Sequence, residues 1–237
     1  MRLFYVIKND MRYQMRYGFY AIYILLTFSY IMILNQITDP IIKSMAGTLI
    51  ILSDPAVLGY FFIGGIWLLE KEEQLHSYMS ISPLKHFEYV LGKISSLGLV
   101  STCSSVIIMG VTMPRVNLFI AAGIIFLSSC FFTLLGLILA TFAKTVNGYL
   151  MISVPPALIL LTPGVLSIFG INFPFATIIP GTIVFNLIRD TLTNNPAHVF
   201  LNIIGLFFWA CLLFMVTLRR ISHEIKPSGG KRHAFDY

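Results

Sequence analysis

Three carboxylates and one lysine follow one another in the stretch Glu70-Lys71-Glu72-Glu73, directly after an apolar run. If the chain beyond is helical, the acids occupy a first turn, where the helix dipole favours negative charge. One face of that helix then carries Leu75, Tyr78, Met79 and Ser82. Ser82 and Pro83 suit the N-cap and first position of the following helix. The stretch predicts a short amphipathic helix over about 70–83, either docked in a groove of a partner protein or lying at a membrane interface.

Motifs for nucleotide binding and catalysis are missing from the sequence. There is no G-x-x-x-x-G-K-[ST] loop to hold phosphates, and no G-x-S-x-G turn. His223-Glu224 lacks the second histidine of a zinc-protease motif, and the 3 cysteines lie inside apolar runs without metal-binding spacing. We therefore expect no catalytic residue, no metal site and no cofactor on this chain.

Polar residues inside the apolar runs are the candidates for lining a transport pathway. Asp54 lies in Ser53-Asp54-Pro55-Ala56, and Ser101, Ser104 and Ser105 lie in a later run. An acid at membrane depth is costly unless it faces water or a partner. The alternatives are an outer vestibule or an ion pair with Lys43 for Asp54, and helix packing for the hydroxyl groups.

The composition places these residues in a membrane protein. Of the 237 residues 57% are hydrophobic and 11% charged, against about 25% charged in soluble domains. This excludes a disordered chain, a nucleic-acid-binding arm and an ordinary soluble domain. Six stretches have spanning length, since a span needs about 20 apolar residues: 18–37, 45–69, 90–112, 117–142, 147–169 and 197–218. We expect an all-α membrane protein with six transmembrane helices.

The basic residues set the orientation and the flanking segments. With both termini cytoplasmic, 13 of the 16 basic residues share one side, and only Lys43, Arg115 and Arg189 lie on the other. Residues 1–16 predict an amphipathic cytoplasmic helix whose charges meet the membrane surface, namely Arg2, Lys8, Arg12 and Arg16. The six-span domain covers 17–218, with an outer re-entrant hairpin at about 170–196, and 219–237 form a cytoplasmic tail. A plain basic flank is the alternative for residues 1–16.

A family resemblance bears on these alternatives. The acids from Glu70 to Glu73, the Ser82-Pro83 pair and the entry Glu88-Tyr89-Val90-Leu91-Gly92-Lys93 resemble the coupling region of ABC-2 type transporter permeases. The residues Asp10, Gln14 and Arg16-Tyr17-Gly18-Phe19-Tyr20 look like those of small bacterial permeases described as fluoroquinolone or other drug exporters. Gln74-Leu75-His76 departs from the pattern, because many relatives carry Gly-Thr-Leu there.

The resemblance implies the ABC-2 exporter fold in a bacterial cell membrane. It also implies two permease subunits, identical or different, that assemble with two soluble ABC ATPase subunits, and ATP and Mg²⁺ bind those partners. Residues 70–83 would contact the ATPase, with Glu72 and Glu73 in polar contacts and Leu75, Tyr78 and Met79 in packing. The cargo would be hydrophobic or amphipathic, such as a drug, lipid or peptide, and no nucleic acid is expected as a partner.

Two other classes of function stay open from the residues alone. A motorless multi-pass membrane protein, such as a channel, a secondary carrier or a peptide-immunity factor, has the same composition. An intramembrane enzyme is less favoured, because no paired catalytic residues converge in the sequence. A soluble P-loop ATPase encoded beside this chain would favour the exporter.

Overall fold

The computed structural model describes residues 2–53, 58–76, 78, 84–113, 116–171, 173–193 and 198–225. These residues are helical or irregular, without a strand. The α-helices are α1 (Arg2–Arg16), α2 (Phe19–Gln36), α3 (Pro40–Ser53), α4 (Tyr60–Glu72), α6 (His86–Thr112), α7 (Leu118–Ala140), α8 (Val146–Leu166), α9 (Pro180–Leu192) and α10 (Val199–Glu224). Two short 3₁₀ turns, η2 (Ser167–Phe169) and η3 (Ala176–Ile178), lie between α8 and α9.

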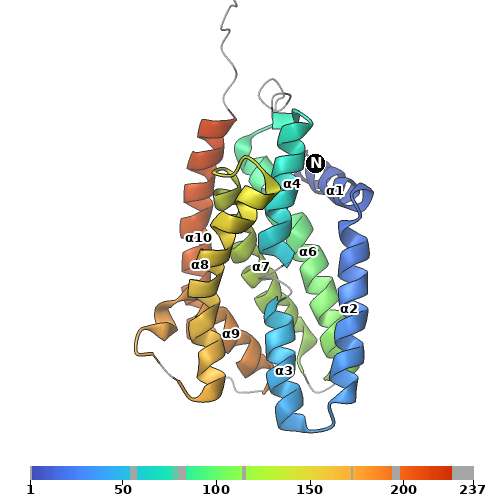
Figure 1. The fold of residues 1–237 in the computed structure, drawn as a ribbon, viewed down its shortest axis with the longest axis vertical. Coiled ribbons are helices and arrows are strands. Elements are labelled where there is room, and N and C mark those ends of the chain that lie inside the picture. The colour runs from blue at the N-terminus through green and yellow to red at the C-terminus, as the bar shows by residue number, and fades with distance from the viewer. Residues whose placement is uncertain are drawn as a thin grey trace, which may run out of the picture.

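The long helices stand side by side, and α7 forms the centre of the bundle (Figure 1). It contacts α4, α6, α8, α9 and α10. The helix α1 lies across one end of the bundle, where α4 and α10 also end. Among the described residues, five segments are long and apolar enough to cross a membrane: α2, α6, α7, α8 with η2, and α10.

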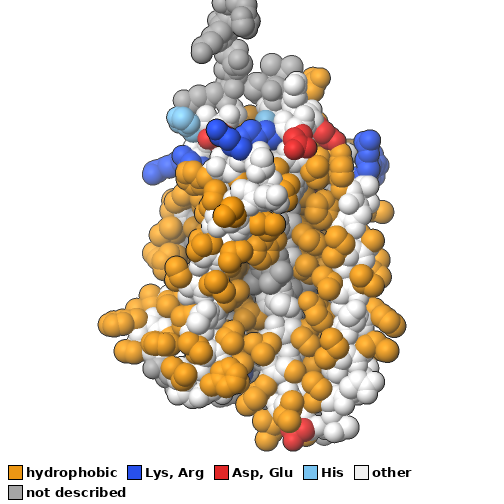
Figure 2. Space-filling view, in the orientation of Figure 1, with side chains coloured by type: hydrophobic (Ala, Val, Ile, Leu, Met, Phe, Trp, Pro, Cys, Tyr) orange, Lys and Arg blue, Asp and Glu red, His pale blue; other side chains and the backbone are white. Residues whose placement is uncertain are grey.

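The surface has the polarity of a protein embedded in a bilayer. Hydrophobic side chains cover the flanks of the bundle in Figure 2, while Lys, Arg and most Asp and Glu side chains gather at the end crossed by α1. Large apolar residues such as Ile24, Met151 and Phe208 are exposed on the long helices. Exposed apolar surface on this scale is stable in lipid rather than in water. The chain is therefore a helical membrane protein.

The second expected span, 45–69, is not one continuous helix. Its two parts are α3, which ends at Ser53, and α4, which begins at Tyr60 after a π-helical turn at Leu58 and Gly59. Asp54 and Pro55 fall in the gap between the described residues. Neither helix alone has the length of a span.

The segment before the last span folds back against the bundle. After Gly170, which has a φ of 77°, the chain passes through η3 and returns as α9, which packs against α3, α7, α8 and α10. Most of α9 is buried, including Phe185 and Leu187. This segment contains few polar residues because α9 is buried within the protein, at the end of the bundle opposite α1.

A tyrosine network holds α4, α7 and α8 together. The Tyr149 hydroxyl of α8 donates to the Tyr60 carbonyl oxygen at 2.5 Å, and the Tyr60 hydroxyl donates to the Ser153 carbonyl oxygen at 2.8 Å. A Cβ at Gly136 would lie 2.5 Å from that same Tyr60 carbonyl oxygen. Only glycine therefore permits this crossing of α4 and α7.

Two boundaries differ from the sequence-based prediction. The helix α6 begins at His86, where the Glu88 carboxylate accepts the backbone N–H of Lys85 at 3.0 Å, so its N-cap is Lys85 rather than Ser82. At the other end of the chain, α10 continues to Glu224, so the first residues of the expected tail are helical. The fourth expected span matches α7 closely, and Asn117 caps it by accepting two backbone N–H groups.

Candidate functional site

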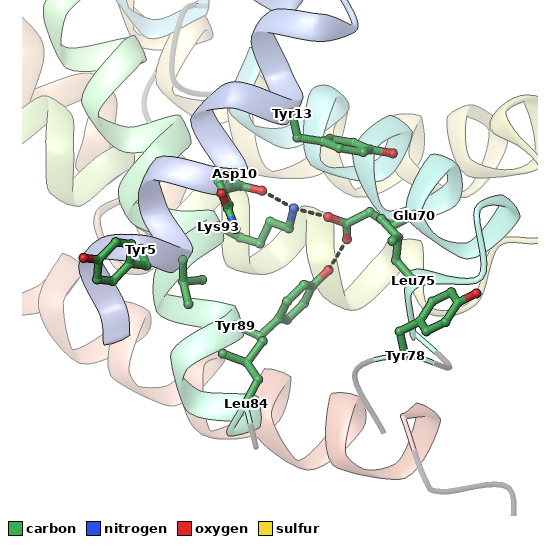
Figure 3. A pocket seen from close by; sticks show the side chains of 11 residues that line it. Tyr5, Asp10, Tyr13, Glu70, Leu75, Tyr78, Leu84, Tyr89 and Lys93 are labelled. Atoms are coloured by element: carbon green, nitrogen blue, oxygen red, sulfur yellow. Dashed lines mark hydrogen bonds and ion pairs between the residues drawn. The ribbon is translucent and has the colours of Figure 1, made fainter. Parts of the chain in front are cut away.

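A buried charged cluster joins three helices at the end of the bundle crossed by α1. Lys93 of α6 pairs with Asp10 of α1 and with Glu70 of α4, the latter at 2.5 Å between Nζ and Oε1 (Figure 3). Their exposed fractions are 2% for Lys93, 8% for Asp10 and 7% for Glu70. One ammonium therefore faces two carboxylates in a region closed to solvent.

Hydrogen bonds from neighbouring residues complete this charged cluster. The Gln14 side-chain amide donates to Asp10 Oδ2 at 2.8 Å, and the Ser96 hydroxyl also donates to Asp10. The Tyr89 hydroxyl donates to Glu70 Oε2 at 2.6 Å. Buried charges are tolerated when their remaining lone pairs are satisfied in this way, and removing one member leaves an uncompensated charge.

The helix α1 contributes to the cluster through a face that differs from its apolar and basic faces. Val6, Asp10 and Gln14 follow helical spacing, and Asp10 and Gln14 are the buried residues of α1. The contact with α6 is close, because a Cβ at Gly92 would lie 2.6 Å from Val6 Cγ1. Glycine at 92 thus lets α1 approach near enough for Asp10 to reach Lys93.

A cavity of about 410 Å³ opens beside the cluster. Tyr5, Tyr13, Tyr78 and Tyr89 contribute aromatic side chains to its wall, and Leu75 and Leu84 contribute apolar ones (Figure 3). The cavity brings α1, the end of α4 and the start of α6 together around one space. Its lining combines aromatic, apolar and charged groups.

The acidic surface at the end of α4 is bound to α1. The hydroxyl of Tyr13 donates to Glu73 Oε2 at 3.2 Å, and the hydroxyl of Tyr17 donates to Oε1. Burial raises the pKa of Tyr13, with a further rise from Glu73, and the hydrogen bond to Glu73 raises the pKa of Tyr17. Both phenols therefore keep their protons at neutral pH and remain donors. Glu72 is exposed beside this contact.

The acids from Glu70 to Glu72 end a helix instead of beginning one. They form the last turn of α4, which is followed by a reversal at Glu73 and Gln74, where Gln74 has a φ of 57°. The prediction that a helix starts with these acids is corrected here: α4 continues past the apolar run, and Glu70 turns inward to Lys93. Glu70 is accordingly no surface group. After the reversal the chain is helical again at Leu75, His76 and Tyr78.

The other predicted docking residues divide into two groups. Leu75 is half-buried in the cavity wall, and the Tyr78 side chain is 64% exposed. Met79, Ser82 and Pro83 lie outside the described residues.

The predicted pathway residues do not meet at the charged cluster. Asp54 lies outside the described residues. Ser101, Ser104 and Ser105 are buried in α6, and Ser104 shares a 2.5 Å hydrogen bond with Thr27 of α2. Ser104 therefore fastens α2 to α6, which is the packing role considered for these hydroxyls. The four basic residues predicted to meet the membrane surface are exposed on α1: Arg2, Lys8, Arg12 and Arg16.

Sequence reasoning missed the centre of this site. Lys93 entered as a basic residue flanking a span and as part of a family resemblance, and Asp10 and Gln14 entered only through a family resemblance. The available signal was the spacing of Asp10 and Gln14, four residues apart on one face of an amphipathic helix. In the part of the chain that the structure covers, no three His, Cys, Asp or Glu side chains are placed to hold a metal ion.

Comparison with known proteins gives a distant similarity. No family model matches the chain. Two curated proteins from two strains of Mycobacterium tuberculosis, each described as a fluoroquinolones export permease protein, are 26% identical to it over 132 residues. That match covers 55% of this chain and 55% of each relative, so the chain spans about half the length of the curated relatives it matches. This helical membrane protein is thus similar to drug-export permeases.

Proposed function

We propose that this chain is the membrane subunit of an ATP-driven exporter of the ABC-2 type. The observation that carries the proposal is the similarity to two export permeases, found in a protein whose long helices are apolar enough to cross a membrane. Such a subunit moves a hydrophobic or amphipathic substrate out of the cell. ATP and Mg²⁺ would bind a separate ATPase subunit.

The proposed topology has six spans with both termini in the cytoplasm. Five spans are the long helices, and the sixth is formed by α3 and α4 together with the π-helical turn at Leu58 and Gly59. Irregular backbone at membrane depth is tolerated where protein surrounds it. The gathering of charges at the end crossed by α1 supports a cytoplasmic position for that end. On this topology α9 is the re-entrant element on the outer side.

The proposed contact with the ATPase is the surface formed by Glu72, Glu73, Leu75 and Tyr78. It follows α4 directly, and α4 is tied to α1 through Glu73 and to α6 through Glu70. If an ATPase moved this surface, the movement would therefore be transmitted to α1, α4 and α6 together. Two permease subunits moved in this way would alternate between inward-open and outward-open arrangements.

The test is a search of the neighbouring genes for a soluble P-loop ATPase, followed by co-expression of that ATPase with this chain. We expect the two to purify as a complex with vanadate-sensitive ATP hydrolysis, and we expect Glu72→Lys with Glu73→Lys, or Leu75→Asp, to lower co-purification about tenfold or more. Glu224→Lys is the matched control, because it places the same change on an exposed residue at the same end of the bundle.

Two results would count against the proposal. Unchanged co-purification in the Glu72, Glu73 and Leu75 variants would refute the coupling surface. Absence of any complex or stimulated hydrolysis with the wild-type chain would favour the motorless alternative.

A further inference from the structure

A second hollow lies at the end of the bundle opposite α1, between α9 and α10. It has a volume of about 780 Å³, which is within the range of about 300–1,000 Å³ typical of small-molecule sites. We call it the α9–α10 groove. The C-terminal end of α9 and the N-terminal end of α10 meet at one end of it, because only residues 193–198 separate the two helices.

Polar and apolar groups occupy different ends of this groove. Asn186 and Arg189 lie late in α9, and His198 and Asn202 lie at the start of α10, so the polar groups gather where the two helices meet. The remaining wall is apolar and includes Ile183 at the start of α9 and Phe208 deeper in α10. The groove is therefore amphipathic along its length.

The apolar wall continues into the lipid-facing surface of α10. Leu201 and Phe208 line the groove and are 68% and 64% exposed. Trp209 also lines it and donates its indole N–H to the Ile178 carbonyl oxygen at 3.2 Å. Water is unfavourable against such a wall at membrane depth, whereas the acyl chains of the bilayer surround it.

The polar end offers charge for an anionic group. The Arg189 side chain is 46% exposed, and its Nε and Nη2 each lie 3.5 Å from Oδ1 of the Asp190 carboxylate, which is 8% exposed. That separation exceeds the roughly 2.7–2.9 Å of a strong charge-assisted hydrogen bond. A guanidinium has five N–H donors, so Arg189 retains the capacity to bind a phosphate. Asp190 and His198 are the other titratable groups that line the groove.

We propose that the α9–α10 groove binds one membrane phospholipid, with its phosphate at Arg189 and an acyl chain along the apolar wall of α10. The proposal commits to a lipid because of this charge complementarity and because the groove is continuous with lipid-facing surface. It is independent of the proposed export function, since the site shares no residue with the charged cluster or the ATPase-facing surface.

The experiment measures lipid binding to the purified, delipidated full chain by native mass spectrometry. Three ligands are titrated: a dioleoyl phosphatidylglycerol, the matching dioleoylglycerol without phosphate, and free glycerol phosphate without acyl chains. The wild type should bind one phospholipid, bind dioleoylglycerol about tenfold or more weakly, and bind no free glycerol phosphate. A hydrogen bond to a charged group is large enough for this difference.

Two variants address the two ends of the groove. Arg189→Gln should lower phospholipid affinity about tenfold or more and remove the preference over dioleoylglycerol, whereas Arg189→Lys should keep the preference. Gly205→Leu should weaken both lipids, because its side chain enters the groove, where a Cβ would lie 3.4 Å from Ile183 Cδ1. Lys43→Gln and Gly123→Leu are the controls, since neither residue lines the groove and a Cβ at Gly123 meets nothing within 4 Å.

The outcomes separate the proposal from its rivals. Equal binding of both lipids by the wild type, or unchanged phospholipid binding in Arg189→Gln, would overturn the phosphate site. If Gly205→Leu instead shifts the protein from dimer to monomer at an unchanged lipid count, a second copy of the chain covers the groove and the proposal is wrong. The thermal midpoint of each variant shows that it is folded.

Discussion

Replacing Lys93 by methionine removes the ammonium from the buried charged cluster and keeps a side chain of similar length. In the wild type the cluster holds one ammonium and two carboxylates, so its formal charge is −1. In Lys93→Met the two carboxylates of Asp10 and Glu70 would face each other without the ammonium, at a formal charge of −2 with a neutral His76, whose Nε2 lies 3.7 Å from Glu70 Oε2. The variant therefore tests whether this cluster stabilises the packing of α1 against α4 and α6.

The expected loss is large for a single substitution. Breaking a buried ion pair by removing one partner costs about 3–5 kcal/mol, because the other charge stays buried and unpaired. For a chain of this size, about 1 kcal/mol corresponds to about 2–4 °C in the thermal midpoint. Lys93→Met should therefore melt roughly 6–20 °C below the wild type in the same detergent.

The assay compares thermal unfolding with the release of α1. If α1 detaches, trypsin should cleave faster after Arg12 and Arg16, which are exposed on this helix. Lys144→Met is the matched control, because Lys144 is exposed and should change neither reading. The combination of Lys93→Met with Asp10→Asn and Glu70→Gln should regain most of the lost stability, since it leaves no unpaired buried charge.

Two results would refute this reasoning. A Lys93→Met midpoint within about 2 °C of the wild type would mean that the cluster contributes little to stability. A neutral triple variant as unstable as Lys93→Met would mean that the loss comes from packing of the lysine stem rather than from charge.

Three further predictions follow from the contacts. Gly92→Ala should lower the thermal midpoint, because the new Cβ would lie 2.6 Å from a side chain of α1. Gly110→Ala in the same helix is the control and should not lower it, since the nearest neighbour of its Cβ is 3.6 Å away. Equal midpoints for the two variants would contradict the close α1–α6 contact. Tyr149→Phe should lower the free energy of unfolding by about 1 kcal/mol, because it loses the hydrogen bond to a backbone carbonyl of α4. Tyr20→Phe should be neutral or stabilising in chemical unfolding, because the Tyr20 hydroxyl is buried without a hydrogen-bond partner in the described structure. Burial raises the pKa of Tyr13 above the value of about 10 in the unfolded chain. The contribution of Tyr13 to stability is therefore present below pH 10 and is lost as the pH rises further. Between pH 9 and 11 the melting temperature of Tyr13→Phe should fall less steeply than that of the wild type, and a parallel fall would contradict this.

The outline of the fold could be predicted because hydropathy is a local property. The expected spans 18–37 and 117–142 agree with α2 and α7 within a few residues. The second span could not be predicted as two helices by its apolar content alone, since a broken and a continuous helix bury similar residues. The prediction for the end of α4 was wrong for a related reason. The helix dipole favours acids such as Glu70 and Glu72 at the start of a helix. Their place at the end of α4 depends on the tertiary ion pair between Glu70 and Lys93.

The sequence by itself determined that this chain lies in a membrane, which end carries the charge and that α1 is amphipathic, because these follow from residue type and order. Only the tertiary structure decided which charges are buried. Asp10 and Lys93 are 83 residues apart, and Glu70 and Lys93 are 23 apart. A charge is buried or solvated according to the partners that the packing brings to it, and those partners come from other helices. The same holds for Arg189 and Asn202, which share the α9–α10 groove only because α9 folds back beside α10.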